Sequence, residues 1–289
     1  MSTFPPRLAA AGFSSVFLLA AGAAVEWGQE LPEPRRVGTL PEPQIVESSG
    51  LVRSPAHPDV FWTLNDSGNP AQIYAVRDSG ELLRTHALRA ENHDWEDLAI
   101  DEKGRLLIAD VGDNFRRRTE LALYRCLEPD PFREPAAPLA VEVFLLKYPK
   151  EVGAQDCEAV IVRSGWACLF TKEKGRTRAL RLPLPDPPPR EAVTLDMLGE
   201  TEAIGTVTAA DLSADGRCLA LLSLDKVVTV EYSVAFEKTG GAEGRPAPFS
   251  GTMRQRSIRL GQSEALAWDG ADLVITTEQR GVFRIEKAR

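Results

Sequence analysis

WEDLAIDE, residues 95–102, decides the fold, because the chain contains four counterparts of this segment. They are ESSGLVRS at 47–54, CEAVIVRS at 157–164, AADLSADG at 209–216 and SEALAWDG at 263–270. Each contains an acid that is followed by a short apolar strand and a turn. The acids, Glu47, Glu96, Glu158, Asp211 and Glu264, are separated by 49, 62, 53 and 53 residues. A period of this length is typical of a repeat architecture.

A second and a third apolar run follow every counterpart, as RLLIADVGDN at 105–114 and LALYRC at 121–126 follow the first. Four repeats have a fourth run, at 81–88, 140–148, 191–198 and 256–260, but the fifth repeat ends at Arg289 without one. We therefore predict an all-β, five-bladed β-propeller of four-stranded antiparallel blades. A strand at about 36–40 completes the last blade and removes two exposed edges. The blades start near residues 44, 94, 156, 208 and 262. The alternative is a β-sandwich.

The N-terminus has the pattern of an export signal. Arg7 provides a positive charge, an apolar stretch follows from Leu8 to Val25, and 21–23 (AGA) is a small-residue cleavage site. We predict a signal peptide at 1–23, a linker at 24–35, and a single propeller domain at 36–289 in a secreted or periplasmic protein. The alternative is a retained membrane anchor. No later apolar run is long enough to span a bilayer, so we expect no membrane insertion after cleavage.

Composition limits the partners. The chain has 289 residues, of which 43% are hydrophobic and 26% are charged, and its formal net charge is −8. This negative charge repels nucleic acid, so the composition favours cations or neutral molecules as binding partners. Four cysteines leave disulfide formation open, although Cys168 and Cys218 lie in apolar strand patterns that favour buried free thiols. The sequence leaves the oligomeric state open.

In a propeller, the first strand of each blade lines the central channel. The five repeated acids would therefore meet at the axis. A second set would lie behind them, at the ends of the next strands: Asp66, Asp113, Glu173, Asp225 and Glu278. Five carboxylates about 8 Å apart repel by roughly 2 kcal/mol per pair at an effective dielectric constant near 20. Raised pKa values, basic partners or a bound cation must relieve this repulsion.

Carboxylate and amide oxygens without cysteine or paired histidine are the ligands that calcium prefers. The predicted metal ligands are Glu47, Glu96, Glu158, Asp211, Glu264, Asp66, Asp113, Asn65 and Asn114. Zinc is disfavoured, since the only histidines are His57, His86 and His93, without a zinc-binding spacing. The alternative is purely structural ion pairing of the acids with Lys172, Lys174, Lys226 and Arg280.

The stretch from Glu47 to Asn114, with ESSGL, WTLNDSGNPAQIYAV, DWEDLAID and IADVGDN, resembles bacterial exported propellers of the SdiA-regulated and esterase-like phytase type. More distantly, the acid ring is similar to the calcium sites of gluconolactonase/paraoxonase-type propellers and of calcium-activated nucleotidases. The resemblance implies that Glu47, Glu96, Glu158 and Glu264 are calcium ligands. Asp211 departs from the pattern because it is one methylene shorter. The lactonase families usually have Asn and Asp at some of these positions, so a lactonase activity does not follow.

Three functions remain open. The first is a calcium-binding module whose axial mouth holds a small anionic or carbohydrate ligand. The second is a calcium-dependent hydrolase of a phosphoester, as in phytases, or of a lactone, and the third is a scaffold for protein assembly. The candidate catalytic residues are His93, Asp94, Asp113 and Asp156. The candidate substrate-binding residues are Lys172, Lys174, Lys226, Arg280 and Trp95.

Overall fold

The computed structural model describes residues 27–240 and 245–289. The predicted signal peptide and the start of the predicted linker lie outside these residues. The described part of the linker runs along the outer strand of blade four, where Gly28 N donates to Met253 O at 2.6 Å and Leu31 is fully buried. Within the described residues, no helix has the length and hydropathy needed to cross a bilayer.

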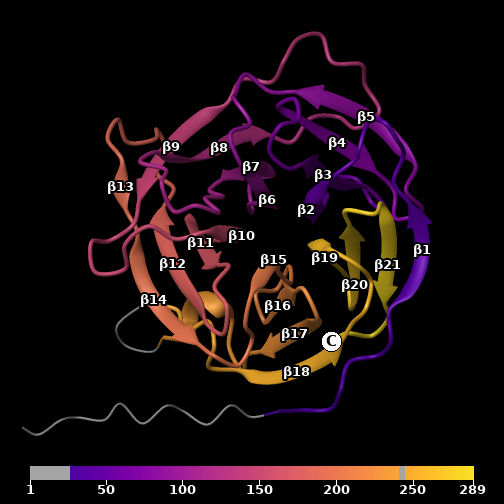
Figure 1. Cartoon of the computed structure of the whole chain (residues 1–289). Helices are drawn as coiled ribbons and strands as arrows, with labels where there is room; N and C mark the ends of the chain where they lie inside the picture. Colours follow the sequence, from indigo (N-terminus) through magenta and orange to yellow (C-terminus); the bar gives the residue numbers. More distant parts are fainter. Residues whose placement is uncertain (1–26, 241–244) are drawn as a thin grey trace, which may run out of the picture.

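Five antiparallel sheets form a closed ring, which confirms the predicted five-bladed β-propeller (Figure 1). Blade one contains β2 (Ser48–Arg53), β3 (Phe61–Asn65), β4 (Gln72–Val76) and β5 (Leu82–Ala87). Blade two contains β6 (Trp95–Ile100), β7 (Arg105–Asp110), β8 (Leu121–Leu127) and β9 (Glu142–Lys147). Blade three contains β10 (Cys157–Arg163), β11 (Trp166–Thr171), β12 (Thr177–Pro183) and β14 (Asp196–Thr201).

The N-terminal strand closes the ring as the sequence predicts. Blade four contains β15 (Val207–Leu212), β16 (Cys218–Ser223), β17 (Lys226–Glu231) and β18 (Thr252–Ser257). Blade five contains β19 (Ser263–Asp269), β20 (Asp272–Thr277) and β21 (Gly281–Ile285), and β1 (Arg35–Thr39) is its outer strand. Because β1 pairs antiparallel with β21, both ends of the propeller domain are held in one sheet.

Two outer strands differ from the sequence-based boundaries. The apolar run at 191–198 is divided between two blades: β13 (Val193–Thr194) pairs in parallel with β9 of blade two, and β14 belongs to blade three. Leu195, between the two strands, is buried and continues the pairing with β9, because its amide donates to Lys147 O at 2.9 Å. In blade four, β18 begins before the predicted run at 256–260, because Thr252 is already paired with Glu231 of β17.

The hydrophobic core is divided into clusters between neighbouring blades. Trp62 of blade one packs in the same cluster as Ile108 of blade two, and Phe61 of blade one packs with Val274 of blade five. All four cysteines, Cys126, Cys157, Cys168 and Cys218, are buried as free thiols. The sheets are therefore held together by apolar contacts rather than by disulfides among the described residues.

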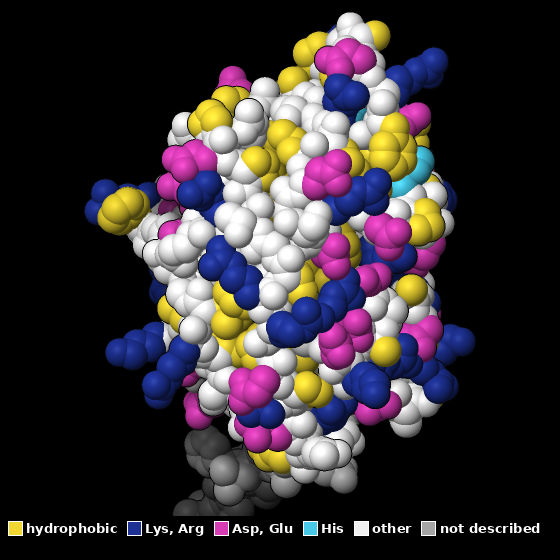
Figure 2. All heavy atoms as spheres, turned by 90° about the vertical axis from the view of Figure 1, so that its right-hand side faces the viewer, with side chains coloured by type: hydrophobic (Ala, Val, Ile, Leu, Met, Phe, Trp, Pro, Cys, Tyr) yellow, Lys and Arg dark blue, Asp and Glu magenta, His cyan; other side chains and the backbone are white. Residues whose placement is uncertain are grey.

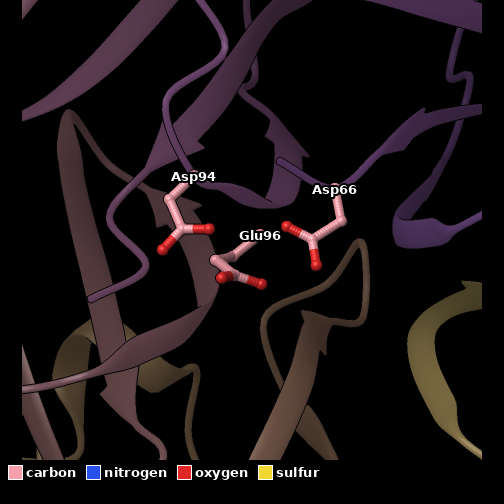
Figure 3. A group of neighbouring side chains, drawn as sticks. All are labelled: Asp66, Asp94 and Glu96. Atoms are coloured by element: carbon pink, nitrogen blue, oxygen red, sulfur yellow. The ribbon is translucent and has the colours of Figure 1, made fainter. Parts of the chain in front are cut away.

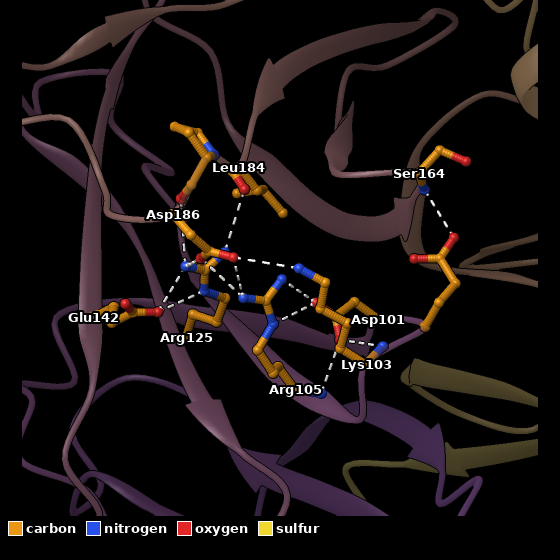
Figure 4. A network of polar contacts seen from close by, with 10 residues as sticks. Asp101, Lys103, Arg105, Arg125, Glu142, Ser164, Leu184 and Asp186 are labelled. Carbon is orange, nitrogen blue, oxygen red and sulfur yellow. Dashed lines mark hydrogen bonds and ion pairs between the residues drawn. The ribbon is translucent and has the colours of Figure 1, made fainter.

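A polar network also joins blade two to the loop after β12 (Figure 4). Arg125, which is 1% exposed, pairs with Asp186 and with Glu142, the latter at 2.7 Å. Arg105 pairs with Asp101 at 2.7 Å and with Asp186 at 2.9 Å. On the side of the ring that carries β1 and β5, acidic and basic side chains are intermixed (Figure 2). On this side of the outer wall, opposite charges therefore lie close to one another.

Candidate functional site

An acidic cavity of about 180 Å³ lies at one end of the channel, where the inner strands begin. Its acids are Glu47, Asp66, Glu96, Glu158, Glu264 and Glu278. All six belong to the two predicted sets, and the predicted Asn114 also lines the cavity. Lys172 is the basic residue of this lining. Sequence reasoning therefore located a real concentration of negative charge.

A β-bulge in each inner strand produces this concentration. The pairing register shifts at one residue near the start of β2, β6, β10, β15 and β19, and this residue is Ser49, Glu96, Glu158, Thr208 or Glu264. A bulge leaves one residue out of the ladder and redirects its side chain. Three of the five equivalent positions are therefore acids, and two are hydroxyl residues.

In two blades, the repeated acid that the sequence aligns with Glu96 is not the bulge residue. Glu47 precedes the bulge of blade one and reaches the cavity from its exposed rim, where its carboxylate accepts a hydrogen bond from Asn69 at 2.8 Å. Asp211 follows the bulge of blade four and lies in a different pocket, with Arg53 and Trp268. There its carboxylate accepts the amide of Trp268 at 2.7 Å. Asp211 is thus not a member of the acidic cavity.

The second predicted set is only partly in the cavity. Asp66 and Glu278 line it, but Asp113, Glu173 and Asp225 have other partners. Asp113 accepts the amides of Arg117 and Arg118, Glu173 pairs with Arg178, and Asp225 accepts the Ser223 hydroxyl. In these blades, the residues that follow the strand in the register of Asp66 are Val111, Lys172 and Leu224.

Asn65, another predicted ligand, has a structural role. Its side-chain oxygen accepts the amides of Val46 and Glu47 at 3.1 Å each, and its amide group donates to Gln44 O at 2.9 Å. Asn65 therefore holds the segment that enters blade one, and its oxygen is already occupied by these donors.

The four candidate catalytic residues are not assembled in one place. Asp94 does not line the acidic cavity, but one of its carboxylate oxygens lies within 4.8 Å of an oxygen of Asp66 and of Glu96, which do. Asp156 instead accepts the amide of Asp113 at 2.9 Å. His93 lines a separate pocket of about 330 Å³, with its Nδ1 3.3 Å from the carboxylate of Asp110. Asp94 is therefore the member of this group that lies next to acids of the cavity.

The candidate substrate-binding residues are also dispersed. Lys172 lines the acidic cavity, where it pairs with Glu158 at 2.5 Å, and Lys174 is exposed. Lys226 donates to the backbone oxygen of Ala203 at 3.0 Å, and Arg280 pairs with Glu42 at 3.0 Å. Trp95 is fully buried, so it belongs to the core and does not form a platform at the mouth.

Three carboxylates converge at the cavity (Figure 3). Asp66 follows β3 of blade one, whereas Asp94 and Glu96 lie at the start of β6 in blade two. One oxygen from each lies within 4.8 Å of the other two. Gly112 makes this approach sterically feasible, because a Cβ there would lie 2.1 Å from Glu96 Oε1 and 2.6 Å from Asp94 Oδ2. The arrangement offers one small space surrounded by hard oxygen donors.

Burial makes negative charge unfavourable in this cavity. Glu96 is 4% exposed, and burial, with Glu158 as the next contributor, raises its pKa well above the ordinary value. Burial likewise raises the pKa of Asp66 and of Asp94. Burial raises the pKa of Glu158 as well, although the Lys172 ammonium acts in the opposite direction. A cation would relieve the same electrostatic cost.

The stability of the protein in a chelator should depend on pH through Glu264. Burial raises the pKa of Glu264 from 4.5 to about 7. The folded state therefore favours the protonated form, and this stabilisation is complete below pH 4.5 and lost as the pH rises through about 7. Each unit of pKa difference is worth about 1.4 kcal/mol. We expect the melting temperature to fall between about pH 4.5 and pH 7 and to level off above pH 7, with a smaller fall in Glu264→Gln.

The matched control for this pH series is Glu191→Gln, which changes an exposed acid away from the cavity. It should retain the full pH dependence of the wild type. Identical slopes for Glu264→Gln and the wild type would contradict the assignment of the titration to Glu264.

Sequence reasoning missed Gly112 and Asp110, and it did not pair Arg118 with Asp110. The segment ADVGDN at 109–114 places a glycine and acids directly after a strand, which is the available signal for a tight loop at the cavity. The long-range partners of this segment follow only from the folded chain.

No family model matches the chain, and neither does any curated protein. Similar solved structures include the PQQ-bound aldose sugar dehydrogenase of Streptomyces coelicolor, with 8% identity, a TM-score of 0.48 and coverage of 88% of this chain and 98% of that chain. Another is the glutaminyl cyclase of Myxococcus xanthus, with 11% identity, a TM-score of 0.49 and coverage of 89% and 97%. Both TM-scores are below 0.5, so the assignment of the fold rests on the strand pairing of this chain itself.

Proposed function

We propose that this chain is a secreted calcium-binding β-propeller that acts as an extracytoplasmic binding module at its axial mouth. The observation that carries the proposal is the convergence of Asp66, Asp94 and Glu96, with one oxygen of each within 4.8 Å of the others, beside the acidic cavity that Asp66 and Glu96 line. Export is inferred from the pattern of residues 1–23, and N-terminal sequencing of the mature protein from an expressing bacterium tests it.

The donor set fits calcium. Calcium binds six to eight oxygen ligands from carboxylates, neutral protein groups and water. Three carboxylates converge, two of them from the lining of the cavity, and Ser49 and Asn114 add neutral oxygens to that lining. Neither histidine nor cysteine lines the cavity among the described residues, so its donors do not favour zinc. Against six acids, Lys172 provides a single positive charge, which leaves an excess that a divalent cation would reduce.

A cation at this position would also recruit a ligand. Calcium held by protein carboxylates keeps coordination positions for oxygens from outside. A small anionic or carbohydrate ligand that enters the mouth would therefore meet both the cation and the polar groups of the rim. This role needs no reaction, and it uses the cavity as the structure presents it.

A calcium-dependent hydrolase of a phosphoester or lactone is the second candidate. The observation that favours it is the ammonium group of Lys172 in the same cavity as the converging carboxylates. A positive side chain beside a cation stabilises a developing anion, and Asp94 would orient an attacking water. Turnover of generic phosphoester and lactone substrates with calcium, absent in Glu96→Gln, distinguishes the hydrolase from the binding module.

The calcium proposal is tested by titrating the purified chain with calcium in a calorimeter and by measuring its melting temperature. We expect one site of measurable affinity. At a free calcium concentration of 100 times Kd, the stabilisation should be about 2.7 kcal/mol. Glu96→Gln should lose both effects, because it removes a charged ligand from the centre of the cluster, whereas the exposed Glu191→Gln should keep them. A wild-type chain that binds no calcium overturns the proposal.

A further inference from the structure

Four hydrogen-bonding groups converge on the carboxylate of Asp110, the last residue of β7. The side chain is fully buried. Its Oδ1 accepts Arg118 Nη2 at 2.6 Å and the Asp94 amide at 3.2 Å. Its Oδ2 accepts the Tyr124 hydroxyl at 3.3 Å and lies 3.3 Å from His93 Nδ1. A buried carboxylate with this many partners fixes the segments that supply them.

Arg118 extends this arrangement to the loop after β7. While Nη2 pairs with Asp110, Nη1 donates to Gly112 O at 2.8 Å. The Gly112 amide in turn donates to Asp94 O at 3.2 Å. The loop that leaves β7 and the loop that enters β6 are therefore joined through Asp110 and Gly112, and Arg118 contacts both of these residues.

The position of Asp94 depends on these loops. Asp66 follows β3 of blade one and Glu96 is the bulge residue of β6, whereas Asp94 precedes β6. A second contact bridges the blades, since the Asn92 side chain donates to Asp66 O at 2.9 Å and accepts the Trp95 amide at 3.1 Å. The distance between Asp66 and Asp94 is thus set by a loop, and that loop is held by Asp110.

We propose that Asp110 and Arg118 form a positioning pair that holds Asp94 where it can share a cation with Asp66 and Glu96. The inference rests on the proposed calcium site and assigns the residues that regulate its affinity. Groups behind the ligands of a metal site typically change its affinity by about 10- to 100-fold. Neither member of the pair touches the cation in this proposal, since both act through the backbone of the loop.

The test is calcium titration calorimetry of the full chain carrying Asp110→Asn. This change keeps the side-chain size but removes the charge that pairs with Arg118. We expect calcium affinity to fall by about 10- to 100-fold, with a smaller calcium-induced rise in melting temperature and an unchanged far-UV circular dichroism spectrum. Arg118→Lys keeps the positive charge, but its single ammonium nitrogen replaces the two guanidinium nitrogens that bind Asp110 and Gly112 O. We therefore expect a smaller loss of calcium affinity than in Asp110→Asn.

Asp101→Asn is the matched control. Asp101 follows β6 of the same blade, is 9% exposed and pairs with Arg105 at 2.7 Å, but it lines the pocket that also contains Asp211. It should lower the melting temperature in a chelator and leave calcium affinity at the wild-type value.

The outcomes separate the inference from the proposed function. Wild-type affinity in Asp110→Asn overturns the positioning pair, as does an equal loss in Asp101→Asn. If Asp110→Asn does not fold, wild-type affinity in Arg118→Lys overturns the pair instead. A wild-type chain without calcium binding removes the proposed function itself, whatever the variants do.

Discussion

A chain that begins at Pro41, without β1, is expected to lose its closed ring and to aggregate. The deletion leaves β21 as an unpaired edge and removes Leu31 and Leu40, which are buried. Burial of one such side chain contributes about 1.5–3 kcal/mol, so the two account for a large share of a typical stability of roughly 5–15 kcal/mol. Size-exclusion chromatography and thermal unfolding measure the effect.

The control for this truncation is a chain that begins at Trp27, which keeps β1 and every contact of the described N-terminal segment. It should remain monodisperse and unfold at the temperature of the full-length protein. If the chain from Pro41 also did so, closure by β1 would not be what stabilises the ring.

Gly112→Ala is expected to lower calcium affinity at least as strongly as the loss of one carboxylate. The new methyl group would lie 2.1 Å from Glu96 Oε1 and 2.6 Å from Asp94 Oδ2, and both carboxylates must move away. The atoms that must move are side-chain ends, so the fold should tolerate the change better than the cluster does. We expect a loss of about 100-fold or more by calorimetry, on the order of 3 kcal/mol.

Gly199→Ala provides the comparison, because Gly199 lies in β14 and a Cβ there would meet nothing within 4 Å. Its calcium affinity should equal that of the wild type. Equal affinity in Gly112→Ala would instead show that the cation does not sit among Asp66, Asp94 and Glu96.

The blade pattern could be predicted because each blade repeats the same local information. Apolar alternation and turn residues recur with every repeat, and the missing strand of the fifth repeat has one plausible source near residues 36–40. The site was harder, because one residue of register decides which way a strand side chain points. Asp211 resembles Glu96 as an acid before an apolar run, yet it follows its bulge and faces another pocket.

The roles of individual residues also differ in whether the sequence pattern predicts them. Glu96, Glu158 and Glu264 could be found because each precedes an apolar strand in the same pattern. Asp113, which looked like a ligand, instead caps the loop that carries Arg117 and Arg118. No local pattern distinguishes this use from that of Asp66 and Glu278, which line the cavity, since all three acids come after a strand.

The sequence by itself determined the five-bladed ring, its closure by an N-terminal strand and the excess of acids at one end of the channel. These features depend on strand periodicity and repeat spacing, which are local properties of the chain. Only the tertiary structure decided that Asp66, Asp94 and Glu96 converge, that Gly112 leaves room for them and that Asp110 holds the loop behind them. The reason is physical: bulges, loop contacts and distances between blades arise when distant segments pack, so a single repeat does not encode them.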